Sequence, residues 1–95
     1  MRSRAEVATD RPSPYLLQLA KHFRHKLDVT FDAERGTIPF DFGRAELSTA
    51  EGTLLLEAVA PTPAELERVE QVIGSHLVRF GRRDELVVEW VSQAA

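Results

Sequence analysis

Two stretches of the chain carry apolar residues at helical spacing, and most of the remaining pattern alternates as half-buried strands do. The first predicted helix begins with Ser13 as N-cap and Pro14 at the first helical position. It ends near His25 or Lys26, where positive charge suits the negative end of the helix dipole. Its apolar face consists of Leu16, Leu19, Ala20 and Phe23, with Tyr15 expected to pack into the core.

The second predicted helix has the clearest local signature, a capping box at Thr62-Pro63-Ala64-Glu65. Gly81 is expected to end it as a left-handed stop. Its apolar face is formed by Leu66, Val69, Ile73, Leu77 and Phe80. Glycine inside a helix costs about 1 kcal/mol relative to alanine, so Gly74 indicates the close approach of a strand or of the first helix.

Alternating apolar and polar residues predict strands around these helices. They cover residues 5–9, 27–31, 38–42, 45–47 and 86–90, with turns at Glu34-Arg35-Gly36 and Glu51-Gly52, and the largely apolar run 53–59 predicts one more strand. The order β-α-β-β-β(-β)-α-β predicts an α+β fold. We expect a two-layer sandwich in which two helices cover one face of a mostly antiparallel sheet of five to six strands.

Gly43 determines whether the ends of the two helices meet. If Gly43-Arg44 is a hairpin turn, four strands separate the helices, which then run in opposite directions with their C-terminal ends roughly 20 Å apart. If Gly43 is a bulge in one long strand, the helices run the same way and share an end. The one-residue shift in alternation after Gly43 favours the bulge.

Composition narrows the function classes. The 95 residues form one domain, residues 1–95, and the 12 Lys and Arg against 15 Asp and Glu argue against nucleic-acid binding. The chain has no cysteine, which excludes disulfides, thiolate metal ligands and cysteine nucleophiles. With neither a signal peptide nor a membrane-spanning run, a cytoplasmic protein without membrane contact is expected.

All three histidines lie in basic runs near the predicted helix ends, Lys21 to Lys26 and His76 to Arg83. At ~100° per residue, His76 lies about 50° from the centre of its apolar face and His22 about 110° from its own, while His25 faces solvent. A metal or haem site, or an acid–base pair, would require them to converge; otherwise they are surface groups at helix ends.

Other reactive groups give a weaker indication of function. Arg79, Arg82 and Arg83 could bind a carboxylate or phosphate, or form a solvated helix end paired with Asp84, Glu85 and Glu89. No local spacing implies a catalytic pair, because Ser48 and Ser75 have no base placed beside them. No catalytic residue is therefore assigned, and the identity of a cofactor stays open.

The sequence resembles a family of small bacterial proteins of unknown function. The resemblance rests on Lys-His-Phe-Arg-His-Lys at residues 21–26, the Phe42-Gly43 step, His-Leu-Val-Arg-Phe at residues 76–80 and a closing strand that ends in Trp90. It runs from about Ala5 to Trp90. The chain departs from the family pattern at Gly81, where a more apolar or aromatic residue is expected.

The resemblance implies an accessory role in iron handling, because members often lie near siderophore-utilisation functions. The family pattern then points to His22, His25, Lys26, His76 and Arg79, and residue chemistry adds Arg83, as a surface for an anionic ligand or an iron complex. A metal- or histidine-dependent enzyme is one alternative. A homodimer is the other, through an apolar sheet face built from Leu55, Val59, Val87 and Val91.

Overall fold

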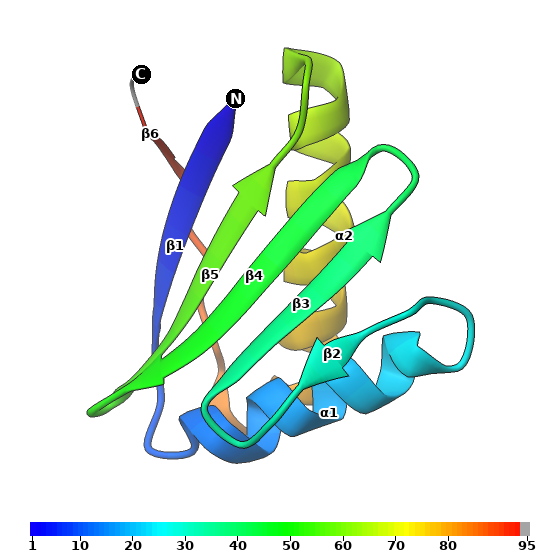
Figure 1. Ribbon diagram of the computed structural model, residues 1–95. Coiled ribbons are helices and arrows are strands. Elements are labelled where there is room, and N and C mark those ends of the chain that lie inside the picture. The colour runs from blue at the N-terminus through cyan, green and yellow to red at the C-terminus, as the bar shows by residue number, and fades with distance from the viewer. Residues whose placement is uncertain (94–95) are drawn as a thin grey trace.

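A computed structural model, which describes residues 1–93, folds into one antiparallel sheet with two helices on one of its faces (Figure 1). The fold class predicted from the sequence is therefore confirmed. The elements in chain order are β1 (Arg2–Ala8), α1 (Pro12–Arg24), β2 (Thr30–Phe31), β3 (Arg35–Phe40), β4 (Gly43–Ala50), β5 (Thr53–Val59), α2 (Pro63–Phe80), the 3-10 turn η1 (Arg82–Asp84) and β6 (Val91–Gln93).

The six strands lie in the order β2-β3-β4-β5-β1-β6, and every neighbouring pair is antiparallel. Alternate residues of the central strands point toward the helices and are almost fully buried, as in Ala5 and Val7 of β1 and Leu54 and Leu56 of β5. The helices contribute the other half of the core through Tyr15, Leu16, Leu19, Ala20, Leu66, Val69, Ile73 and Leu77.

The two helices are not aligned with each other. α2 packs over β4 and β5, whereas α1 lies across the sheet and contacts every strand from β2 to β5 (Figure 1). A helix of 13 residues is about 20 Å long, and four strands spaced about 4.8 Å apart occupy a similar width. The C-terminal part of α1 consequently reaches the C-terminal half of α2.

The predicted start of α1 was wrong by two residues. Pro12, not Pro14, occupies the first helical position, and Arg11 is an N-cap that makes no side-chain capping bond. Ser13 instead donates a hydrogen bond from its hydroxyl to the carbonyl of Ala33. Both prolines fit the first turn, where no amide donor is needed, so local sequence could not choose between them.

The hairpin prediction at Gly43 was also wrong, both as a bulge and as a turn. The β3–β4 turn is formed by Asp41 and Phe42, and Gly43 is the first residue of β4, paired with Phe40. The β2–β3 turn likewise lies one residue earlier than predicted, so Gly36 pairs within β3. Four strands do separate the helices along the chain, as the hairpin alternative implied, yet the crossing of α1 brings their C-terminal regions together.

The second helix begins as predicted and ends differently. Thr62 accepts a hydrogen bond from the amide of Glu65, which confirms Thr62 as the N-cap, while the Glu65 carboxylate accepts from the Thr62 hydroxyl and not from its amide. Gly81 caps the C-terminus with φ −96°, so it is not the left-handed residue that was expected. Its role is steric, because a Cβ at Gly81 would lie 2.2 Å from Cδ1 of Leu86.

The sheet face opposite the helices is mainly polar, and the predicted apolar face is interrupted. Cross-strand neighbours place Arg2 beside Val59, Glu6 beside Leu55 and Arg4 beside Val91. Val87 is exposed but precedes the short closing strand, which pairs only over residues 91–93. Within residues 1–93, neither helix is long and apolar enough to cross a membrane.

Candidate functional site

The rings of His22 and His76 meet where α1 crosses α2. Their centroids lie 4.8 Å apart with the planes tilted by 49°, although 54 positions separate the residues in sequence. The shared helix end that the favoured bulge implied is therefore present, although the bulge is not, and the separation of roughly 20 Å expected for the hairpin alternative was wrong. That separation assumed helices aligned with the strands, whereas α1 lies across them.

Phenylalanine side chains flank the histidine pair on its protein side, while His22 stays exposed. The Phe23 ring lies 5.0 Å from each imidazole, and the Phe80 ring lies 5.5 Å from His22. Phe40 of β3 packs edge-on against Phe23 at 5.4 Å. We call these five residues, His22, His76, Phe23, Phe40 and Phe80, the histidine site.

The histidine site borders a cavity of about 490 Å³ at the end of α1. The cavity lining consists of His22, Phe23, His25, Lys26, Leu27 and Phe40. The outer wall continues to Phe42, which stacks on Phe40 and carries the Arg68 guanidinium 4.1 Å from its ring centroid. One end of the fold thus presents aromatic surface next to positive charge.

The tautomer of His76 follows from its hydrogen bond. Nδ1 of His76 lies 2.6 Å from the carbonyl of Val72, which can only accept, so Nδ1 is the donor. The neutral ring therefore keeps its lone pair on Nε2. His76 is half-buried, and the backbone bond fixes the orientation of the ring against His22.

His22 experiences a positive environment. Partial desolvation is the main cause that lowers the pKa of His22 below its ordinary value of 6.5, although the residue is largely exposed. His76, His25, Arg79 and Lys26 lower this pKa further through charge repulsion. Because these groups repel a proton on His22, they would attract an anion to the same place.

The structure brings together five of the six residues that the sequence singled out. His22, His25 and Lys26 line the cavity, His76 packs against His22, and Arg79 is close enough to affect the pKa of His22. The sixth, Arg83, lies in η1 and is exposed, and it is not among the groups that affect His22. Its neighbour Asp84 pairs with Arg11 and Tyr15 at the start of α1.

The predicted set omitted the aromatic wall. Phe23, Phe40 and Phe80 are half-buried, and their apolar spacing could be explained by the core alone. Only their joint position at one end of the fold marks them as part of a site. The one local signal was Phe23 itself, because it stands between two histidines in the basic run.

The protein alone supplies too few ligands for a metal site. Across residues 1–93, no group of three or more His, Asp or Glu side chains is close enough to hold a metal ion. Two imidazoles leave at least half of the coordination positions of zinc or iron unfilled. A metal at the histidine site would therefore need further ligands from another molecule.

The fold and the site together define a small α+β sandwich with a cationic aromatic site at one end. Residues 4–91 match the family described as "Uncharacterized protein conserved in bacteria (DUF2218)", and the chain belongs to this family. The predicted family resemblance is thus confirmed. Among curated proteins, none matches the chain.

A solved structure of similar fold extends this finding. The NMR structure of PA4090 from Pseudomonas aeruginosa matches with a TM-score of 0.83 and 29% sequence identity. The match covers 99% of this chain and 98% of that chain. The two proteins therefore share the sandwich over essentially their whole length.

Proposed function

We propose that this protein is a cytoplasmic accessory protein that binds a small anionic ligand carrying aromatic groups at the histidine site. A ferric catecholate complex is the ligand class that fits best, in a siderophore-utilisation context. The observation that carries the proposal is the meeting of His22 and His76 from two separate helices. Their ring centroids lie 4.8 Å apart, beside the rings of Phe23 and Phe80.

The chemistry of the site supports an anion with flat apolar faces. Lys26 and Arg79 supply permanent positive charge, and His22 and His25 add charge when protonated. The rings of Phe23 and Phe40 offer surface on which an aromatic ligand can stack or pack edge-on. A catecholate complex of iron has both properties, because it is anionic and displays aromatic rings.

The ligand count supports a preformed complex over a bare ion. An iron ion already wrapped by catecholates needs no further protein ligands and can be held by outer contacts. Two imidazoles alone would hold zinc or iron weakly. Among the described residues that line the cavity, none is a carboxylate, so no negative charge in the lining would repel an anionic ligand.

The proposal is tested by calorimetric titration with the ferric complex of 2,3-dihydroxybenzoate, with zinc chloride as a separate probe. We expect saturable binding of the ferric complex that weakens about tenfold or more in His22→Ala and in Lys26→Ala. Lys21→Ala is the matched control, because Lys21 is exposed on α1 and does not line the cavity.

Three outcomes count against the proposal. Binding that is equal in Lys21→Ala and Lys26→Ala would place the ligand elsewhere. Tight stoichiometric zinc binding that needs both histidines would favour the metal-dependent alternative. If neither titration of the folded protein produces a heat change, the histidines have structural roles only.

The affinity should also depend on pH in a defined direction. A bound anion stabilises protonated His22, so binding should strengthen as the pH falls through the lowered pKa of His22, below 6.5. The pH dependence should be reduced in His22→Gln. An affinity that is independent of pH between 5 and 8 would contradict a role of His22 in holding the anion.

A further inference from the structure

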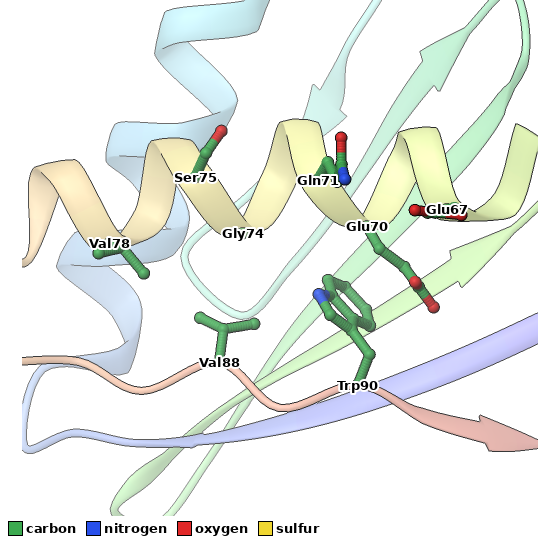
Figure 2. Close-up of a pocket in the computed structure, with 8 residues that line it drawn as sticks. All are labelled: Glu67, Glu70, Gln71, Gly74, Ser75, Val78, Val88 and Trp90. Carbon is green, nitrogen blue, oxygen red and sulfur yellow. The ribbon is translucent and has the colours of Figure 1, made fainter.

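A second and larger cavity lies on the other side of α2, away from the histidine site. It has a volume of about 720 Å³ and is formed between the outer surface of α2 and the segment that leads into β6 (Figure 2). Its lining consists of Glu67, Glu70, Gln71, Gly74, Ser75, Val78, Val88 and Trp90.

Gly74 and Trp90 shape the floor of this cavity. A Cβ at Gly74 would lie 3.4 Å from Nε1 of Trp90, so the glycine lets the indole lie close under the helix. In Figure 2 the nitrogen edge of Trp90 faces Gly74, and its six-membered ring extends toward the side of Glu70. Trp90 is only half-buried, which leaves part of this aromatic surface open.

Apolar and acidic groups lie at different places along the cavity. Val78 and Val88 face each other at one end, and Glu67 and Glu70 lie toward the other, one helical turn apart (Figure 2). Neither glutamate forms an ion pair within residues 1–93, and the lining contains no lysine or arginine. The cavity therefore carries uncompensated negative charge beside an aromatic ring and apolar walls.

We propose that this cavity binds an aliphatic ammonium compound, such as a small alkyl diamine. The ammonium group would lie between the carboxylates of Glu67 and Glu70 and the indole face of Trp90, a combination that recognises organic cations. The alkyl chain would cover the methyl groups of Val78 and Val88, and the second ammonium group would extend past them into solvent. An anion would be repelled by the glutamates, and a neutral apolar ligand would leave them without a partner.

This ligand is distinct from the anion proposed for the histidine site. Gly74 and His76 are two residues apart, which is about 200° around a helix, so they face nearly opposite sides of α2. The two binding surfaces thus share a helix but no side chain, and either proposal can fail without the other.

Trp90 provides a direct assay because it is the only tryptophan of the chain. The probe is 1,6-diaminohexane, followed by tryptophan emission and by calorimetry, with 1,6-hexanediol as its neutral counterpart. We expect a saturable change of emission with the diamine alone. Glu70→Gln should weaken diamine binding about threefold to fivefold, as expected for loss of one partly solvated charge pair.

Two further variants sharpen the test. Val78→Lys places an ammonium group of the protein at the cavity and should abolish diamine binding. Glu51→Gln removes the same charge as Glu70→Gln from the distant β4–β5 turn and should leave the affinity unchanged. Circular dichroism checks that each variant is folded.

Several results would overturn the proposal. An equal response to 1,6-hexanediol would show an apolar groove without charge recognition. Equal weakening of diamine binding by Glu70→Gln and Glu51→Gln would show that the effect comes from the net charge of the protein and not from this cavity. A folded protein that shows neither heat nor emission change up to tens of millimolar diamine has no such site.

Discussion

Replacing Gly43 by alanine should be among the most destabilising single-methyl changes in this fold. A Cβ at this position would lie 2.6 Å from the carbonyl oxygen of Val59 and 2.9 Å from Cγ2 of Val69. The residue also has φ +156°, which side chains disfavour. The close approach joins the first residue of β4 to the end of β5 and to α2.

The magnitude follows from which atoms can move. Overpacking a core costs about 1–3 kcal/mol, and the upper end applies here because the nearest atom belongs to a paired backbone strand. An unfavourable φ adds about 1 kcal/mol or more, so we expect Gly43→Ala to lower the free energy of unfolding by about 3–4 kcal/mol. For a domain of this size that corresponds to a fall in Tm of roughly 12–30 °C.

Gly52→Ala is the matched control. Gly52 has φ +66°, but a Cβ there would meet nothing within 4 Å. Gly52→Ala should therefore lower the free energy of unfolding only by the cost of a positive φ for alanine, which is about 1 kcal/mol or roughly 4–8 °C in Tm. Urea unfolding followed by Trp90 fluorescence measures both variants. Equal losses would refute the argument, because the close contacts of Gly43 would then contribute nothing.

Three further predictions concern single contacts. The pKa of His22 lies below its ordinary 6.5, so the unfolded chain binds a proton at this residue more readily than the folded protein does. The free energy of unfolding should therefore decline as the pH falls through 6.5, and it should decline less in His22→Gln. An NMR titration of His22 should place its midpoint below 6.5. Gly81→Ala should lower the free energy of unfolding, measured with urea, by about 1–3 kcal/mol, because the new Cβ would clash with Leu86. Leu86→Ala should then lower it by less in the Gly81→Ala protein than in the unmodified protein. Tyr15→Phe should cost about 1–2 kcal/mol in thermal unfolding, because the Tyr15 hydroxyl donates to Asp84; no loss would show that the bond contributes nothing.

The sequence was sufficient for the fold because its local signals agree with one another. The capping signature at Thr62, the apolar face of α2 and the apolar run of β5 all specify elements without reference to distant residues. Two of the errors, at Gly43 and Gly81, fall at glycines that are needed because of a distant or tertiary contact. Gly43 is needed because Val59 and Val69 approach it, and no local pattern reveals that.

The candidate site was likewise predicted where local spacing decides and missed where contacts between distant residues decide. The helical angle of His76 correctly indicated a half-buried ring, and the exposure of His25 was also predicted correctly. A shared helix end was expected from a bulge at Gly43 that is absent; the meeting of His22 with His76 depends instead on the direction in which α1 crosses the sheet. That direction is set by side chains of α1 packing on four strands, which is a property of the whole core.

The position of α2 between two candidate surfaces gives the histidine site a built-in control. His76 faces α1, whereas Gly74 faces Trp90 and Val88 of the segment before β6. A substitution at Glu70 therefore changes the charge of the protein without touching the phenylalanine wall, and a substitution at His22 leaves the indole unperturbed. If loss of His22 abolishes binding of the ferric complex while Lys21→Ala, which removes a positive charge outside the cavity, and Glu70→Gln both leave it unchanged, the effect is local chemistry and not a general change of charge or stability.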